Sequence, residues 1–254
     1  MAQYGRFAEV YDSLMDDVPY DNWVENIIQI FSEYDFKPKD ILELACGTGN
    51  MTNRFAKKGY KIVGTDISED MLMIAQDKAH GNNLKVNYLY QDMTNINYPR
   101  KVDCVLSFCD GLNYITSDED MAKVLKGVYN LLLDEGFFIF DISSYYKLSE
   151  ILGNNRFMES RADVLYFWEN YFDKANGLLD MELNIFMKCD DFEDDEELYE
   201  RVHEEHKQRA HKMEELKALI EENGFDVLRV CDADGLSELN EKTEREYYIC
   251  RKRR

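Results

Sequence analysis

Two glycines, Gly47 and Gly49, follow a short apolar run in the stretch ILELACGTG at residues 41–49. The apolar run predicts a buried strand, so the glycines fall on the turn after it, where ligands bind in open α/β sheets. Glycine lets a ligand approach the backbone because it has no side chain, but a tight turn also needs glycine for its dihedral angles. The pair alone therefore leaves a cofactor site and a purely structural turn both open.

An acidic residue after the next apolar run strengthens the cofactor interpretation. Asp66, in the stretch IVGTDIS, stands where a carboxylate can accept hydrogen bonds from both hydroxyls of a ribose and would repel a 2′-phosphate. A helix N-cap or a surface acid is the alternative. The dinucleotide fingerprint G-x-G-x-x-G also requires a third glycine, but Thr52 occupies that position. These residues therefore weaken a nicotinamide or flavin assignment.

The glycine turn and Asp66 require a sheet to hold them, and the chain supplies strands in alternation with helices. Apolar runs predict strands at residues 41–44, 61–65, 86–90, 102–108 and 136–142. Apolar positions at steps of three and four predict helices at residues 19–34, 68–80 and 117–136. Ser68 and Ser117 fit N-caps, and Gly81 suits a left-handed position after its helix. This alternation predicts an α/β fold with a mostly parallel sheet that is covered on both faces.

The pattern changes after residue 144 and predicts an inserted antiparallel sheet. The stretches DVLYFWENYF and LLDMELNIFM flank DKANG, in which the Asn176-Gly177 pair is a strong turn signal between two strands. Alternate residues of the second strand are apolar, which predicts one buried face. The acidic run DDFEDDEE at 190–197 is expected to be a solvated loop that leads to a third strand at 199–209. Later patterns predict that the α/β core resumes, with a helix at 213–224 and strands at 225–230 and 246–251.

The composition disfavours several function classes. Hydrophobic residues make up 45% of the 254 residues, which is enough for a packed core. The 51 acidic and 30 basic residues leave a net charge of −21, which would repel nucleic acid and anionic membrane surfaces. The six cysteines form no C-x-x-C pair, and the N-terminus lacks the pattern of a signal peptide. We therefore expect a cytoplasmic protein with reduced thiols and with no nucleic-acid or membrane partner.

The chain resembles the class I S-adenosylmethionine-dependent methyltransferases over nearly its whole length, in the stretches ILELACGTGNMT, VGTDISEDMLMIAQDKA, YLYQDM and VLSFCDGLNYI. It is also similar to a bacterial group of small-molecule methyltransferases with an antiparallel cap, in YDSLMDDVPYDNW, YFWENYFD and HEEHKQRAH. The resemblance implies a Rossmann-like, doubly wound, mostly parallel seven-stranded sheet with the last strand antiparallel, plus a small inserted antiparallel sheet. It implies one methyltransferase unit with an N-terminal helical lid (1–35), a cofactor-binding core (36–144 and 211–254) and a β cap on the substrate side (145–210).

The resemblance also implies a site for S-adenosylmethionine, whose product is S-adenosylhomocysteine. In that site Glu43 would hold the methionine part, Asp66 the ribose, and Ile67 one face of the adenine. Asp92 and the backbone of Met93 would read the adenine edge. The full set that it implies is Tyr11, Glu43, Ala45, Gly47, Gly49, Asp66, Ile67, Met71, Asp92, Met93 and Phe108.

Three details of this implied site concern the backbone and the N-terminal segment. Gly47 and Gly49 would let the backbone approach the cofactor, and Ala45 stands where many relatives have glycine. Tyr11, and with it Tyr4 and Trp23, would close over the cofactor, with packing in the core as the alternative.

Methyl transfer from a sulfonium is an in-line displacement with a neutral leaving group, so alignment and exclusion of water supply most of the catalysis. No metal is required. An amine acceptor must react in its neutral form, and Asp110 and Tyr114 are the candidates to take its proton; a turn acid and a packing ring are the alternatives. Trp168, Glu169 and Arg209 are expected at the acceptor, although strand alternation does not say which of them face the cleft.

The expected function is methyl transfer to a small-molecule acceptor by a monomer or homodimer, with an amine favoured over a hydroxyl or carboxyl. Two other classes stay open: a catalytically inactive cofactor-binding or regulatory protein, and a nicotinamide-dependent oxidoreductase, which Thr52 opposes. A metal enzyme is disfavoured, because His203 and His206 are three residues apart and would point to opposite faces of a strand.

Overall fold

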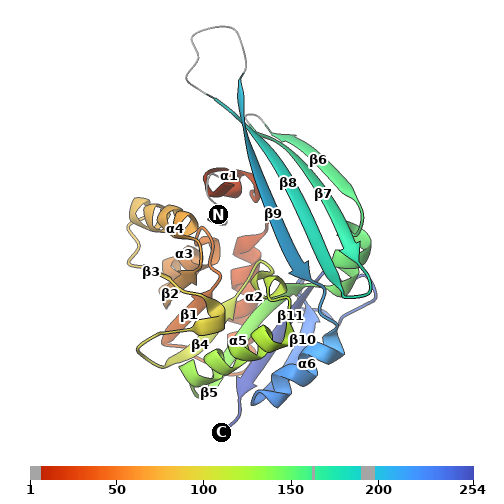
Figure 1. The fold of residues 1–254 in the computed structure, drawn as a ribbon. Helices are drawn as coiled ribbons and strands as arrows, with labels where there is room; N and C mark the ends of the chain where they lie inside the picture. The colour runs from red at the N-terminus through yellow and green to blue at the C-terminus, as the bar shows by residue number, and fades with distance from the viewer. Residues whose placement is uncertain (1–6, 162–163, 190–197) are drawn as a thin grey trace.

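The computed structural model describes residues 7–161, 164–189 and 198–254, and its centre is a seven-stranded sheet (Figure 1). The strand order is β10-β11-β5-β4-β1-β2-β3. Strands β1 to β5 pair in parallel, whereas β11 is antiparallel to both of its neighbours. The bounds are β1 (Asp40–Leu44), β2 (Lys61–Asp66), β3 (Asn87–Tyr90), β4 (Val102–Ser107), β5 (Leu132–Ser143), β10 (Phe225–Asp232) and β11 (Arg245–Lys252). The predicted mostly parallel sheet with its last strand antiparallel is confirmed.

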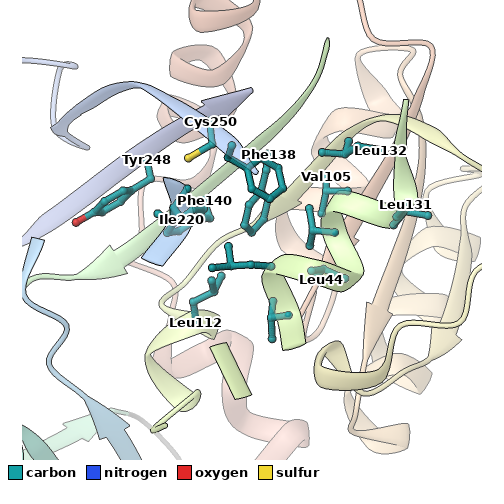
Figure 2. Close-up of a cluster of buried hydrophobic side chains, with 14 of the residues drawn as sticks. Leu44, Val105, Leu112, Leu131, Leu132, Phe138, Phe140, Ile220, Tyr248 and Cys250 are labelled. Carbon is teal, nitrogen blue, oxygen red and sulfur yellow. The ribbon is translucent and has the colours of Figure 1, made fainter. Parts of the chain in front are cut away.

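Helices cover both faces of this sheet, and the strands bury side chains on both sides. In β4, Val105 packs toward α5, while Cys104 and Leu106 pack in a second cluster with α2 and α3. Figure 2 shows part of the first cluster, in which Phe138 of β5 lies beside Val105 and packs against Phe140. The helices are α1 (Phe7–Leu14), α2 (Tyr20–Glu33), α3 (Asn50–Lys57), α4 (Glu69–Gly81), α5 (Asp118–Leu131) and α6 (Met213–Glu222). Burial on both faces explains why these strands read as continuous apolar runs.

The predicted helix starts are confirmed, and two predicted helix ends are wrong. Helix α5 ends at Leu131 rather than near residue 136, because strand β5 already begins at Leu132. Ser68 Oγ accepts a hydrogen bond from the Met71 N–H at 3.3 Å, so it caps α4 as expected. Gly81 does not follow α4 but is its last residue, and Asn83 takes the left-handed conformation with φ 56°. The helix extends further because the Asn82 side chain donates to the carbonyl of Lys78 at 2.8 Å and satisfies its last turn.

A second, antiparallel sheet stands over one end of the core sheet (Figure 1). Its strands are β6 (Arg156–Arg161), β7 (Val164–Asp173), β8 (Leu178–Lys188) and β9 (Tyr199–Arg209). The predicted hairpin at Gly177 (φ 66°) and the buried face of β8 are confirmed, whereas β6 was not predicted. The acidic run 190–197 lies outside the described residues. We call this sheet the cap.

Short helical segments complete the described elements, and the last two of them contact the cap. They are the 3-10 turns η1 (Met93–Asn95) and η2 (Gly111–Tyr114) and the π-helical segment η3 (Lys147–Leu152). From η2, the Asn113 amide donates to the carbonyls of Ser143 at 3.1 Å and Arg209 at 3.0 Å, which ties β9 to the core. Across the described part of the chain, no helix is both long and apolar enough to span a membrane.

Candidate active site

A cleft of about 1160 Å³ opens where β1, β2 and β4 end, between the core, helix α1 and the cap. The core lines it with the turns that follow these strands, including Gly47, Asp66 and Phe108. The cap lines it with side chains that include Trp168 and His206. This is the edge of the sheet where the sequence predicted a ligand.

The two glycines of the first turn prove to have different neighbours. Gly47 (φ 51°) lines the cleft, and a Cβ added to it would meet no atom within 4 Å. A Cβ on Gly49 (φ 73°) would instead overlap the Tyr88 hydroxyl and lie 3.0 Å from Ala75 Cβ. Only Gly47 therefore leaves room for a ligand beside the backbone. The expectation that Gly49 does the same is corrected, because the Tyr88 ring from β3 fills that space.

We expect Gly49→Ala to lower the free energy of unfolding by about 2–4 kcal/mol, because it adds an overlap to an unfavourable left-handed backbone. Gly47→Ala should cost only about 1 kcal/mol, since its backbone is strained but its surroundings are open. Urea unfolding measures both. Combining Gly49→Ala with Tyr88→Phe, which removes the overlapping hydroxyl, should recover part of the loss. Equal losses for the two single variants would show that Tyr88 is not the obstacle.

Two buried carboxylates flank the glycine turn. Glu43, near the end of β1, accepts a hydrogen bond from the Thr52 hydroxyl. Burial raises the pKa of Glu43 to about 8, and the hydrogen bond from Thr52 acts in the opposite direction. Asp66 accepts from the backbone N–H of Gly47 at 2.8 Å and of Ser68 at 2.9 Å. Burial raises the pKa of Asp66, and these two N–H groups counteract it. Asp66 thus joins the glycine turn to the start of α4 while it lines the cleft.

The side of the cleft beyond Asp66 combines an apolar surface with polar groups. Ile67 is 47% exposed and lines the cleft together with the buried Met71. Asp92 and Met93 line the cleft after the neighbouring strand β3, and one Asp92 oxygen accepts from both the N–H and the hydroxyl of Thr94 at 2.8 Å. An exposed aliphatic side chain inside a cleft offers a flat aromatic ring a surface on which to pack.

Helix α1 closes one side of the cleft and is held there by Asp12. The Asp12 carboxylate accepts hydrogen bonds from Thr48 at 2.6 Å, Asn50 at 2.9 Å and Lys78 at 2.6 Å. Burial alone would raise the pKa of Asp12, but these donors hold it below its usual value. The neighbouring Tyr11 lines the cleft, and burial raises the pKa of its phenol. No sequence pattern singled out Asp12.

The expected role of Trp23 beside the cofactor does not match its position. The centre of its ring lies 4.9 Å from the guanidinium carbon of Arg245. Trp23 is not among the residues of the described chain that line the cleft. Tyr4 lies outside the described residues.

A buried ion cluster forms the floor beyond Phe108. Arg245 of β11 binds the carboxylates of both Asp110 and Asp141 at 2.8 Å. Burial alone would raise the pKa of Asp110, but the Arg245 guanidinium holds it below its usual value. Asp141 also accepts the backbone N–H of Asp110 at 2.7 Å and of Cys109 at 3.2 Å, which fixes the turn after β4.

The cap-side half of the cleft contains Tyr114 and His206. The Tyr114 hydroxyl lies 3.4 Å from Nδ1 of His206, with the two rings edge to face. Burial lowers the pKa of His206 to about 4, so the ring is neutral near pH 7. His203 of the same strand lies beside Asn184 and Glu182 and also borders the cleft. The described residues hold no group of three or more His, Cys, Asp or Glu side chains that could bind a metal ion.

Comparison with known proteins decides the family. Residues 41–136 match the family model described as a methyltransferase domain. The chain is 36% identical to a solved S-adenosylmethionine-dependent methyltransferase from Clostridium acetobutylicum, with 99% of each chain covered and a TM-score of 0.88. The chain belongs to the class I S-adenosylmethionine-dependent methyltransferases.

Two further similarities extend over the whole length of this methyltransferase. It is 34% identical over 251 residues to a protein of Geobacillus sp. (strain WCH70) that is named as a methyltransferase. The match covers 98% of this chain and 99% of that relative. It shares its fold with the sugar N-methyltransferase KedS8 from Streptoalloteichus sp. ATCC 53650, at 14% identity, a TM-score of 0.79, and 96% and 93% coverage.

The cleft of this methyltransferase fits its cofactor, S-adenosylmethionine. The open space beside Gly47, the buried carboxylate of Asp66 and the exposed Ile67 together suit a nucleoside. The predicted cofactor residues that line the cleft are Tyr11, Glu43, Ala45, Gly47, Asp66, Ile67, Met71, Asp92, Met93 and Phe108. Gly49 is the exception, for the reason given above.

Two of the three cap residues predicted to face the acceptor of this methyltransferase do not line its cleft. Trp168 lines the cleft. Adjacent residues of a strand point to opposite faces, so Glu169 lies on the other face of β7, where its carboxylate binds Arg156 of β6 at 2.6 Å. The Arg209 side chain binds Asp118 at 2.7 Å and anchors β9 to α5. These two expectations are corrected.

Proposed function

We propose that this methyltransferase acts on a small-molecule amine that binds in the cap-side half of the cleft. The observation that carries the proposal is the neutral His206 beside Tyr114 in a chamber walled by apolar side chains of the cap, such as Met181 and Leu183. A ring that stays uncharged near pH 7 can accept a proton. The sugar N-methyltransferase among the proteins of similar fold supports the same class of acceptor.

In this proposal the core half of the cleft holds the cofactor. Asp66 accepts the ribose hydroxyls, Ile67 packs on the adenine, and Asp92 with the backbone of Met93 binds the adenine edge. Glu43 lies toward the methionine part. Helix α1 and the cap act together as a lid that excludes water during the reaction, and Asp12 holds α1 against the core through Lys78.

Bound S-adenosylmethionine supplies a methyl group on a sulfonium with a neutral leaving group. The chain orients the acceptor nitrogen in line with that group, keeps water out and takes up one proton. The Tyr114 hydroxyl can take up the amine proton as it passes its own proton to Nδ1 of His206, 3.4 Å away. Asp110, the other predicted catalytic residue, is a weaker proton acceptor because Arg245 and Gln208 bind its two oxygens at 2.8 Å. We assign it to positioning.

Matched acceptor pairs test this proposal. Small amines and the alcohols of the same skeleton, for example glucosamine and glucose, are incubated with S-adenosylmethionine, and release of S-adenosylhomocysteine is measured. The proposal expects turnover with at least one amine and none with its matched alcohol. Turnover confined to alcohols or carboxylates would contradict it. Binding of S-adenosylhomocysteine without turnover of any acceptor would favour the regulatory-protein alternative.

His206→Gln is expected to lower kcat by about 10²-fold, because glutamine keeps a hydrogen-bonding group but cannot take the proton. Steady-state rates with an accepted amine measure the change, and calorimetry checks that cofactor affinity is retained. His80→Gln, at an exposed position of α4 and not among the cleft-lining side chains of the described residues, is the matched control and should leave kcat within about twofold. Equal rates for the two variants would remove His206 from the mechanism.

A further inference from the structure

We propose that the acceptor carries an acidic oxyanion, a carboxylate or a phosphate, and that Lys147 binds it in the cap-side half of the cleft. This inference rests on the proposed function and narrows its substrate class. Lys147 is the first residue of η3, and its side chain lines the cleft. The Lys147 backbone N–H donates to Ser144 Oγ at 3.1 Å, which fixes the position where the side chain leaves the core.

The charges around the cleft distinguish Lys147 from the other cations that line it. Arg245 binds two carboxylates at 2.8 Å, and Lys207 binds Asp180 at 2.8 Å. The Lys147 ammonium forms no ion pair or hydrogen bond with any residue in the described ranges. Arg245 binds both Asp110 and Asp141 and offsets one of their two charges, and neither carboxylate lies within ion-pair distance of the Lys147 ammonium.

The surroundings of Lys147 make it unfavourable for its ammonium to have no anionic partner. Burial and the neighbouring Arg245 lower its pKa, whereas Asp110, Glu244 and Asp141 act in the opposite direction. A desolvated ammonium without a hydrogen-bonded partner is unfavourable, and an anionic group on the acceptor would supply that partner.

The neighbouring strand β7 carries a buried hydrogen-bond donor, the indole of Trp168. Its indole Nε1 is buried and has no hydrogen-bond partner within the described part of the chain. Trp168 lies on β7, which packs on η3, and it lines the same cleft as Lys147. An indole N–H can only donate, and because this nitrogen has almost no exposed surface, the ring would have to turn toward the cleft to meet an acceptor on a ligand. The unpaired ammonium of Lys147 therefore carries the preference for an acid-bearing amine, although the chain as a whole is acidic.

Trp168 also makes the test possible. The chain has two tryptophans, so Trp23→Phe leaves Trp168 as the single indole fluorophore. This variant, saturated with S-adenosylhomocysteine, is titrated with glucosamine 6-phosphate against glucosamine and with β-alanine against propylamine. We expect the acid-bearing member of at least one pair to bind about tenfold or more tightly, the range of a hydrogen bond to a charged group. No preference in either pair, including no response to the acids, overturns the inference.

Two charge-matched variants assign the effect to Lys147. Lys147→Met should abolish the preference, while Lys126→Met, which removes the same charge from an exposed position on α5, should preserve it. A preference that survives Lys147→Met also overturns the inference. Turnover of acid-bearing amines at the wild-type rate and KM by Lys147→Met would overturn it while leaving the proposed function intact. Failure of every amine, acidic or neutral, would instead contradict the proposed function.

Discussion

Arg245→Met is expected to lower the free energy of unfolding by about 3–5 kcal/mol at pH 7.5, as measured by urea denaturation. Arg245 is the partner shared by the carboxylates of Asp110 and Asp141, and Asp141 is fully buried. Its removal would leave two acids in the interior with no cation to offset their desolvation. The turn after β4 should loosen as well, since Asp141 holds its backbone N–H groups.

The loss should depend on pH. Without Arg245, burial and mutual repulsion would raise the pKa values of both carboxyls above their unfolded values, so the folded variant would bind protons more readily than its unfolded chain. Its stability relative to wild type should therefore be lowest at pH 7.5 and should recover as the pH falls toward 5. Arg251→Met, on the same strand but at an exposed pair with Glu135, should cost at most about 1 kcal/mol. Equal losses for the two variants, or a deficit independent of pH, would contradict this account.

Asp66→Ala is expected to weaken binding of S-adenosylhomocysteine by about 1–3 kcal/mol, or about 5- to 150-fold in Kd, in a calorimetric titration. The substitution removes the acceptor proposed for the ribose hydroxyls. It also frees the N–H groups of Gly47 and Ser68, so the glycine turn would no longer be fixed against α4.

A neighbouring acid provides the control for Asp66. Glu69 begins α4, is exposed and is not among the cleft-lining side chains of the described residues. Glu69→Ala removes the same charge and should change Kd by less than about twofold. An unchanged affinity in Asp66→Ala, or an equal loss in Glu69→Ala, would show that the ribose is held elsewhere.

The core was predictable because its signals are local. Strands buried on both faces read as apolar runs, and Ser68 and Ser117 mark the helix starts that the structure contains. Strand β6 was not predictable in this way, because RFMESR mixes charged and apolar residues and four of its six side chains bear polar or charged groups. It forms a strand because β7 offers it an edge with which to pair.

The cofactor half of the site was more accessible to sequence reasoning than the acceptor half. Asp66 and Ile67 lie next to a recognisable turn, whereas Arg245 and Asp110 are 135 positions apart and meet only after the sheet is assembled. A charged residue within an otherwise apolar strand, such as Asp141 in IFDIS, is the signal that could have revealed the cluster. No pattern could predict that Gly49 faces Tyr88, because that contact depends on how β3 packs beside the first turn.

The most direct test of methyl transfer to a small-molecule amine follows the methyl group itself. The protein is incubated with S-adenosylmethionine carrying a labelled methyl group and with separate pools of small amines, small alcohols, RNA and protein, and the label in each pool is counted. The account predicts label in the small-amine pool, bound to nitrogen by mass spectrometry, and its loss in His206→Gln. Label confined to RNA, protein or the alcohols would contradict it.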